Sequence, residues 1–471
     1  MSACAKWGAH REQPNVTAAM HVAGNNELAE FLAANPDIDA VQIMITDPSG
    51  VLRGKAVRRS ELERIFDSGR QVAGSILGLD ITGKDVDDTG LVWDTGDADM
   101  TARPVARTLT RAPWLAVPTG QLLLTMFDGA GAPAAADPRH ALVRVVERFA
   151  RAGLTPVVAC ELEFYLLKEE PGGRLVPAGA GRHSERQKID AYSLQRLDDL
   201  APLFNDVYVA ATAQGLPAET LMSEYSPGQF EITLHHRGDA LRAVDEAVMF
   251  KRVLRGVAQK HGLTACFMAK PFTARAGSGL HVHVSVNDAQ GSNLFASDDP
   301  SGTDSLRQAV GGMKASMAES MAVFAPNANS YRRFVSESYA PVAPIWGINN
   351  RSVSLRVPAG PAVSRHVEHR ICGADVNLYL AVATVLGAAA FGMRDRLDPG
   401  PPVEGNGYLQ PGERTLPGSW REALNLAAQS EFLEETLGKE FLKIYLAIKN
   451  QECARFSAEV SELDYAWYLR S

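Results

Sequence analysis

Apolar and polar residues alternate with two different periods along this chain, and these periods predict where strands and helices lie. Between residues 25 and 130, short apolar runs such as Ala40–Ile45 and Gln121–Met126 alternate with turns rich in Gly and Asp. Short apolar runs bounded by turn residues are typical of strands. The pattern therefore predicts a small strand-rich domain over residues 25–130, preceded by a loose leader over residues 1–24.

Longer periodic segments follow residue 130. Asp137-Pro138 places a capping acid and a first-turn proline before an apolar stretch, which is typical of a helix start. We expect a second, larger domain over residues 137–471, after the Gly- and Ala-rich segment 129–133. The predicted helices cover residues 191–214, 238–261, 303–324, 375–395 and 419–450, and the predicted strands cover residues 156–167, 229–235, 280–286, 351–357 and 366–371.

Several predicted strands carry acids or histidines on one face. Residues i and i+2 of a strand lie on the same side, so Glu161 and Glu163 project together from an otherwise apolar segment. The same alternation groups His281 with His283 and Ser285, and His366 with Glu368 and Arg370. One such pattern is usually an ordinary polar face of a strand. Several in one chain favour a shared partner, because unpaired charge in an apolar strand is costly.

Two further acids, Glu224 and Glu231, differ in parity, so one straight strand cannot aim both to the same side. Pro227-Gly228 between them predicts a bend that would bring them together. The candidate ligands of divalent ions are therefore Glu161, Glu163, Glu224, Glu231, His281 and Glu368. Carboxylates with one imidazole fit Mg²⁺ or Mn²⁺ better than zinc.

Arginines follow these strands, at positions 332, 333, 351, 356 and 370. Guanidinium groups match phosphate and carboxylate, although any one of these arginines fits a surface ion pair equally well. The chain has no Walker-type Gly-x4-Gly-Lys-Ser/Thr loop. ATP, if used, would be held by metal ions and arginines.

Composition narrows the class of protein. The chain has 471 residues, 46% hydrophobic and 22% charged, which is typical of a soluble globular protein with two domains. A net charge of −8 without a basic tract argues against nucleic acid binding. The five cysteines are widely spaced and form no CxxC pair, the N-terminus lacks a signal-peptide core, and the apolar stretch Leu378–Met393 favours a buried helix over a membrane span. We therefore expect a cytoplasmic protein that is not bound to a membrane.

From about residue 40 to the C-terminus, these segments resemble the glutamine synthetase family. The motifs that carry the resemblance are Glu161-Leu-Glu163-Phe, Glu224-Tyr-Ser-Pro-Gly-Gln-Phe-Glu231, Lys270-Pro, Gly277-Ser-Gly-Leu-His281-Val-His283, Asn329-Ser-Tyr-Arg-Arg333, Asn350-Arg351 and Glu368-His-Arg370. The resemblance implies an α+β fold, with an N-terminal β-grasp domain before a catalytic domain built on a curved antiparallel sheet and surrounding helices. It also implies a dodecamer of two stacked hexameric rings, with active sites between neighbouring subunits.

The resemblance also implies roles for individual residues. Glu163, Glu224 and Glu231 match the ligands of one metal ion, and Glu161, His281 and Glu368 match those of the other. Glu219, His283 and Ser285 match positions that contact ATP, Gly277, Arg333 and Arg370 match positions that hold glutamate, and Arg351 and Arg356 match positions that face the transferred phosphoryl group. The implied reaction forms γ-glutamyl phosphate from L-glutamate and ATP, after which an amine displaces phosphate.

The chain departs from the family where ammonium is handled. An aspartate in the N-terminal domain is replaced by Ala73, and an acid in a flap over the site is replaced by Tyr339, although Glu337 lies two residues earlier. Ala276 also replaces an asparagine beside Gly277. Loss of two acids should weaken ammonium use and leave glutamate activation intact, and Ala73 leaves room for a carbon chain. This combination resembles the γ-glutamylpolyamine and γ-glutamylputrescine synthetase branch.

The leading hypothesis is thus a ligase that joins L-glutamate to an organic amine, with putrescine or a polyamine favoured. The acidic stretch Asp80–Asp99 would attract a polycation, or it is a solvated loop. The alternatives are a γ-glutamyl monoamide synthetase for ethanolamine or an alkylamine, a glutamine synthetase that uses Glu337 as its base, and an inactive scaffold. Tyr408 lies in a context that differs from the adenylylated tyrosine of the family, so we do not expect that regulation.

Overall fold

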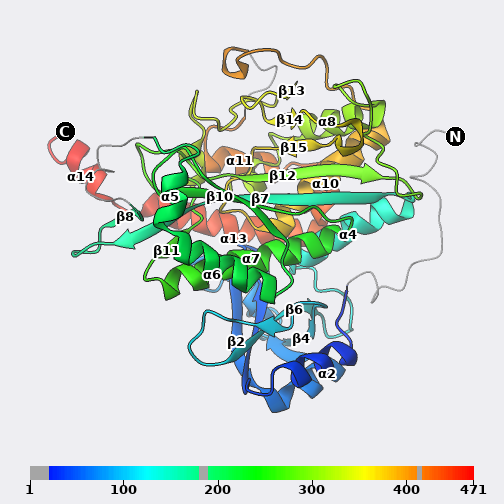
Figure 1. Cartoon of the computed structure of the whole chain (residues 1–471), viewed down its shortest axis with the longest axis vertical. Coiled ribbons are helices and arrows are strands. Elements are labelled where there is room, and N and C mark those ends of the chain that lie inside the picture. The colour runs from blue at the N-terminus through cyan, green and yellow to red at the C-terminus, as the bar shows by residue number, and fades with distance from the viewer. Residues whose placement is uncertain (1–20, 180–188, 411–415) are drawn as a thin grey trace.

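Two β-sheets organise the molecule, and the smaller sheet is built from the N-terminal part of the chain (Figure 1). The structure is a computed structural model and describes residues 21–179, 189–410 and 416–471, so most of the predicted leader lies outside the described residues. The elements of this part are α2 Asn25–Ala34, β1 Ala40–Thr46, β2 Leu52–Arg58, α3 Leu62–Ser68, β3 Arg70–Ala73, β4 Asp99–Pro104, β5 Thr110–Arg111 and β6 Thr119–Phe127.

The smaller sheet has the order β2-β1-β6-β4-β3 in the described chain, with β5 paired to β6. The central strands β1 and β6 run parallel, and the other pairs are antiparallel. This order is compatible with the β-grasp architecture, which stays a prediction.

Strand β6 forms the wall between two hydrophobic cores. Every residue of β6 is buried, because its alternate side chains enter different cores. Leu122 and Leu124 pack in the small N-terminal core, whereas Leu123 and Phe127 pack in the large core that fills the rest of the molecule. The smaller sheet is therefore attached to the larger part of the fold along a fully buried strand.

The larger sheet has nine strands in the described chain and carries the candidate ligands. Its order is β13-β14-β15-β12-β7-β10-β9, with β8 and β11 paired to β7. The bounds are β7 Thr155–Glu169, β8 Leu175–Pro177, β9 Ala218–Ser223, β10 Gln229–Leu234, β11 Thr264–Cys266, β12 Leu280–Asn287, β13 Trp346–Ile348, β14 Leu355–Val357 and β15 Val367–His369. The sheet is mixed, because β13 and β14 run parallel. The other pairs of this sheet in the described chain are antiparallel, as the family resemblance implies.

The strand predicted over residues 351–357 is shorter than expected. Asn349 has a left-handed backbone with φ of 48°, and the Asn350 side chain accepts hydrogen bonds from the backbone N and the hydroxyl of Ser352 at 3.0 and 2.6 Å. These local bonds hold a turn in place of the first half of the strand. Arg351 therefore lies in a loop, and only Leu355–Val357 joins the sheet.

The helices pack around the larger sheet, and three predicted helices are interrupted. Within the predicted helix 191–214, Pro202 lies in the first turn of a new helix. Within 303–324, the Ser320 hydroxyl donates to the carbonyl oxygen of Ser316 where the first helix ends. Within 419–450, Ser430 caps a second helix, and Gly438, which has positive φ, precedes a third. The bounds are α4 Pro138–Arg151, α5 Leu194–Asp199, α6 Ala201–Ala213, α7 Ala240–Lys260, α8 Asp304–Ser316, α9 Met321–Phe324, α10 Leu378–Asp395, α11 Trp420–Ala427, α12 Glu431–Leu437, α13 Lys439–Ala458 and α14 Glu462–Tyr468.

Helix α10 is the central helix of the large core. It is the one described helix that is long and apolar enough to cross a membrane, but 83% of that window is buried inside the fold, as predicted from the sequence. Helix α8 packs closely against it: a Cβ atom at Gly312 would lie 2.1 Å from the carbonyl oxygen of Ala388. A core position, rather than a membrane, accounts for the apolar composition of α10.

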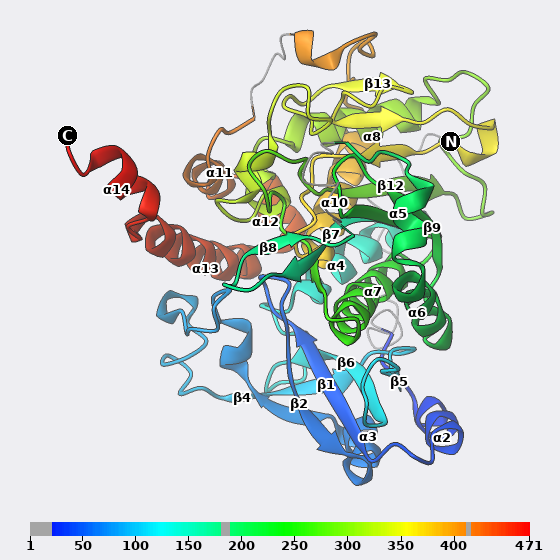
Figure 2. The same ribbon diagram turned by 60° about the vertical axis from the view of Figure 1, so that its left-hand side comes forward.

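Helix α13 joins the C-terminal part of the chain to the N-terminal sheet (Figure 2). Its residues Ile444 and Ile448 complete the small core. Asp80 is fully buried and forms an ion pair with Arg455 of α13, so the first acid of the acidic stretch holds the fold together rather than attracting a polycation. The other aspartates of that stretch are exposed.

Candidate functional site

The register of the larger sheet brings the predicted ligands together. Glu161 of β7 lies opposite His281 of β12, and Glu163 lies opposite Glu231 of β10. Glu368 of β15 lies opposite His283, the next position on the same face of β12. Directly opposite residues share a face of the sheet, so these side chains converge from four neighbouring strands.

Ligand atoms within this cluster are close enough to hold metal ions. Among the described residues, two groups have ligand atoms within 4.8 Å of one another: Glu161, His281 and Glu368, and Glu163, Glu231 and His281. The first group equals one predicted ligand set. The second contains His281 in place of the predicted Glu224, which follows β9 at a tight turn where Gly228 has φ of 76°. Glu224 still lines the same cavity as Glu163 and Glu231.

The charges of the cluster favour a bound cation. Burial, together with the neighbouring carboxylates of Glu161 and Glu163, raises the pKa of Glu231 to about 12. Burial and Glu163 likewise raise the pKa of Glu224 to about 7. Carboxylates that resist ionisation together are the expected state of a metal site without its ion, because a divalent cation supplies the missing positive charge. Oxygen ligands with one imidazole fit Mg²⁺ or Mn²⁺.

The other side of the cluster is already compensated. Burial disfavours the charged form of Glu368, but Arg370 and His281 outweigh burial and lower its pKa to about 2. Arg356 donates from Nη1 to the second Glu368 oxygen at 2.8 Å. Arg356 and Arg370 thus hold Glu368 ionised and fix its position, which a metal ligand requires.

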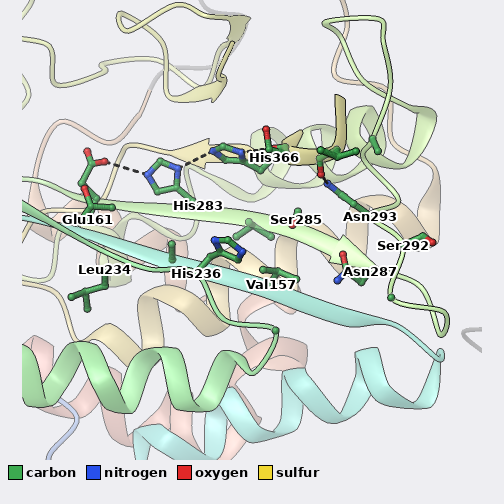
Figure 3. A pocket seen from close by; sticks show the side chains of 18 of the residues that line it. Val157, Glu161, Leu234, His236, His283, Ser285, Asn287, Ser292, Asn293 and His366 are labelled. Atoms are coloured by element: carbon green, nitrogen blue, oxygen red, sulfur yellow. Dashed lines mark hydrogen bonds and ion pairs between the residues drawn. The ribbon is translucent and has the colours of Figure 1, made fainter. Parts of the chain in front are cut away.

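A cavity of about 890 Å³ opens on one side of the cluster (Figure 3). It runs along β12, where His283, Ser285 and Asn287 face it at alternate positions. Val157 and Leu234 form part of its apolar lining. The predicted ATP-contacting residues Glu219, His283 and Ser285 all line this cavity. An elongated cavity with an apolar side and a cluster of acids at one end is suited to a nucleotide whose phosphates meet metal ions.

His366 was not assigned a role from the sequence, and it lines the same cavity. Its Nε2 lies 3.1 Å from Nδ1 of His283, and Nε2 of His283 lies 3.4 Å from Oε2 of Glu161 (Figure 3). The other nitrogen of His366 donates to the carbonyl oxygen of Ser364 at 2.7 Å. The signal available in the sequence was the spacing of two residues between His366 and Glu368, because His366 directly precedes β15 and residues at this spacing share a face in extended chain.

A second cavity, of about 580 Å³, opens on the opposite side of the cluster. The predicted substrate residues that line it are Gly277, Arg333, Glu337, Tyr339, Arg351 and Arg370. Neither Arg356 nor Ala73 is among the described residues that line either cavity. Arg356 acts instead on Glu368, and Ala73 lies in β3 of the N-terminal sheet, paired with Asp99.

The loop around Gly277 is held in place from several directions. Gln229 donates to the carbonyl oxygen of Gly277 at 2.9 Å, and the Tyr165 hydroxyl donates to the carbonyl oxygen of Ala276 at 2.8 Å. A Cβ atom at Gly277 would lie 2.6 Å from the carbonyl oxygen of Ala269 and 2.7 Å from Cγ of Arg333. Only glycine fits between this backbone and the buried Arg333, which explains the Gly-Ser-Gly motif.

The chain was compared with known proteins. A family model described as "Glutamine synthetase, catalytic domain" matches residues 135–468. Gamma-glutamylputrescine synthetase PuuA of Escherichia coli (strain K12) is 38% identical over 452 residues, which cover 94% of each chain. Glutamate–isopropylamine ligase of a Pseudomonas species is 32% identical over 441 residues, or 92% of this chain and 95% of the relative. The solved structure "GmaS/ADP complex-Conformation 1" superposes with a TM-score of 0.82 at 26% identity, over 94% of this chain and 99% of that chain.

Proposed function

Because the chain belongs to the glutamine synthetase family, we propose that it is an ATP-dependent ligase that joins L-glutamate to an organic amine. The observation that carries the proposal is a cluster of candidate metal ligands, most of whose members line two cavities. It is joined by Ala73, which stands where the family resemblance implies an acid that handles ammonium. The cluster supports phosphoryl transfer, and the replacement supports an acceptor other than ammonia.

The two cavities suit the two halves of the reaction. We propose that ATP occupies the first cavity, beside Glu219, His283 and Ser285, and that glutamate occupies the second, beside Gly277, Arg333 and Arg370. Two or more Mg²⁺ or Mn²⁺ ions would neutralise the phosphates during transfer. Arg351 and Arg356 would stabilise charge near the transferred phosphoryl group. The γ-carboxylate attacks the terminal phosphorus of ATP and displaces ADP to form γ-glutamyl phosphate. The unprotonated amine then attacks the acyl carbon, inorganic phosphate leaves, and the nitrogen loses a proton to give the amide.

The relatives support an organic amine as the acceptor. One relative is named for putrescine and another for isopropylamine. We favour putrescine or a polyamine, because the putrescine-named relative is 38% identical and Ala73 leaves room for a carbon chain. Ethanolamine, alkylamines and ammonia remain the alternatives to be tested.

We further propose that the active form is a cytoplasmic homo-oligomer, a dodecamer of two hexameric rings. Ala73 supports an oligomer, because it is not among the described residues that line the cavities of its own chain. A neighbouring copy would have to supply it. Mixed assemblies of two inactive variants, one altered at Glu163 and one inactivated by a bulky side chain at Ala73, would regain activity if sites are shared. Absence of any regain would argue for sites within one chain.

A panel of amines tests the function. Phosphate release is measured with glutamate, ATP, Mg²⁺ and each of 1,4-diaminobutane, spermidine, ethanolamine, isopropylamine and ammonium, with Glu163→Gln as the inactive control. We expect turnover with an organic amine that exceeds turnover with ammonium. Strong turnover with ammonium alone would show a glutamine synthetase, and no turnover with any acceptor would show an inactive scaffold.

A further inference from the structure

Three tyrosine rings and one carboxylate stand at the second cavity without a role in glutamate activation. They are Tyr192, Tyr225, Tyr339 and Glu337, and all four line the cavity. The tyrosine residues are 71%, 43% and 60% exposed, so they lie at the mouth of the cavity rather than in the core. Exposed aromatic rings around an opening need a reason, because burial is their usual state.

Hydrogen bonds hold two of these tyrosines side by side. The backbone N of Tyr192 donates to the carbonyl oxygen of Ser223 at 2.9 Å, and the backbone N of Asp190 donates to the carbonyl oxygen of Tyr225 at 2.9 Å. The Ser223 hydroxyl adds a bond to the carbonyl oxygen of Asp190 at 3.0 Å. The backbone that carries Tyr192 is thus fixed beside the backbone that carries Tyr225, and both residues line the cavity.

The backbone is strained at the same place. Eight non-glycine residues in the described chain have positive φ, and three of them line this one cavity: Tyr192 at 58°, Glu337 at 62° and Tyr339 at 58°. The left-handed region is unfavourable for side chains of this size. Strain of this kind persists where the surrounding structure imposes it, and it concentrates at binding sites.

The charges at the mouth separate Glu337 from the other acids. Among the described residues that line the second cavity, Glu337 is the one carboxylate outside the predicted metal ligands. Lys270 donates from Nζ to the carbonyl oxygen of Arg275, Arg333 donates to the carbonyl oxygen of Ile371, and Arg370 forms an ion pair with Glu368. Glu337 forms no ion pair with another described residue, and Arg351 is the remaining arginine of the lining that could compete with a ligand for it.

We propose that Tyr192, Tyr225, Tyr339 and Glu337 form a subsite for a second positive charge on the acceptor amine. Aromatic faces and a carboxylate together recognise an alkylammonium group. The amine that reacts would point towards the metal cluster, and its other end would be bound at the mouth. This inference rests on the proposed ligase function and specifies its acceptor as a diamine or polyamine rather than a neutral monoamine.

The subsite is tested with two acceptors that differ only in charge at the far end. In 1,4-diaminobutane the far end is an ammonium group, and in pentylamine a methyl group replaces it. Hydroxylamine, a small uncharged nucleophile, reports glutamate activation separately through γ-glutamyl hydroxamate. We expect kcat/KM of the wild type for 1,4-diaminobutane to exceed that for pentylamine by about tenfold or more.

The variants Tyr192→Leu and Tyr225→Leu keep apolar volume and remove the aromatic faces. Each should lower kcat/KM for 1,4-diaminobutane about tenfold through KM, and change the value for pentylamine less than about twofold. Tyr192→Phe should retain the preference, because it keeps the ring. Tyr465→Leu, at an exposed tyrosine of α14, is the matched control and should change neither value.

Glu337→Gln separates binding from proton transfer. If Glu337 binds the far end of the amine, the substitution raises KM for 1,4-diaminobutane and leaves hydroxamate formation unchanged. If Glu337 is instead the base, the substitution lowers kcat for every acceptor, and Glu337 is not part of the subsite. If the leucine variants lose kcat/KM equally for both amines, or change the size of the oligomer, the subsite is overturned. The tyrosine rings would then contribute to packing and not to recognition of the amine. Absence of hydroxamate would overturn the ligase function itself, whereas hydroxamate without a preference for the diamine would overturn only the subsite.

Discussion

The two cavities share one cluster of acids, but different kinds of backbone build them. Strands β7, β10 and β12 supply much of the lining of the first cavity, so its side chains are placed by regular alternation. The second cavity is lined mostly by loop residues, within segments 191–192, 223–229, 270–277 and 333–340. Strands place the groups proposed to bind metal ions and ATP, and loops carry the groups proposed to hold glutamate and to choose the acceptor. Substitutions in these loops can therefore change which acceptor binds without disturbing the acid cluster that both cavities share.

The largest expected effect comes from the cluster that both cavities share. Glu163→Gln removes a charge from the metal site but keeps an oxygen for the bond that Gly279 donates at 2.6 Å. We expect phosphate release with every acceptor, hydroxylamine included, to fall by about 100- to 1000-fold. The exposed Glu404→Gln serves as the matched control. Retained turnover would show that Glu163 is not a metal ligand.

A change at Ala73 should alter the acceptor alone. Ala73→Asp restores a carboxylate, so kcat/KM for ammonium should rise about tenfold and that for a bulky amine should fall about tenfold, with hydroxamate formation unchanged. Ala73→Ser, which adds an uncharged group, separates charge from size. If Ala73→Asp has no effect on either acceptor, Glu337 or another base handles the amine, as in the glutamine synthetase alternative.

The dependence of metal binding on pH tests the charge of the cluster. The raised pKa of Glu224, about 7 against a usual 4.5, means that the folded state binds a proton more tightly than the unfolded state. Without metal, the free energy of unfolding should therefore fall as pH rises from about 4.5 to 7. Mg²⁺ needs ionised carboxylates, so protonation of Glu224 alone should make its affinity roughly eightfold weaker at pH 6 than at pH 7.5, and the raised pKa of Glu231 should weaken it further. Thermal melts with and without Mg²⁺ measure both effects, and Glu224→Gln should remove the share of the pH dependence that belongs to Glu224. An affinity that does not change with pH would contradict this charge assignment.

The smallest expected effect lies at the base of the loop that carries Tyr339. The Tyr408 hydroxyl donates to the carbonyl oxygen of Ala340 at 3.1 Å, and Tyr408→Phe removes this bond. A bond of this kind contributes about 1 kcal/mol, so KM for the amine should rise about fivefold, whereas KM for ATP stays the same. Tyr465→Phe is the control. An equal change in both values would show that the loop serves both cavities.

Strand patterning was the part of the fold that the sequence predicted well. Parity placed the polar residues of each strand on one face, and the family resemblance then grouped Glu161, His281 and Glu368. The register of β7, β12 and β15 brings these three side chains together. Whether two residues of one strand share a face depends only on their spacing in the sequence, so this prediction needs no knowledge of distant partners. The motifs also predicted the family, which the comparisons confirmed.

Features that depend on distant partners were not predicted. The parallel pairing of β13 with β14 follows from the turn at Asn349 and Asn350. The alternation of apolar and polar residues does not indicate how this turn arranges the edge of the sheet. The proximity of Tyr192 to the cavity depends on backbone bonds to residues near Tyr225, which lie more than thirty positions later. Positive φ at a tyrosine is equally invisible in sequence, because propensity there favours glycine and asparagine.

Helix α13 has a consequence for the synthesis of the chain. Ser49 and Glu452, which are 403 positions apart, are hydrogen-bonded, and Ile444 and Ile448 complete the core of the N-terminal sheet. At a ribosomal rate of about 5–20 residues per second, that sheet, whose last strand ends at Phe127, waits roughly 15–65 s for Ile448. The first part of the protein to emerge is thus among the last to become stable, and truncation within α13 should unfold a sheet that was translated hundreds of codons earlier.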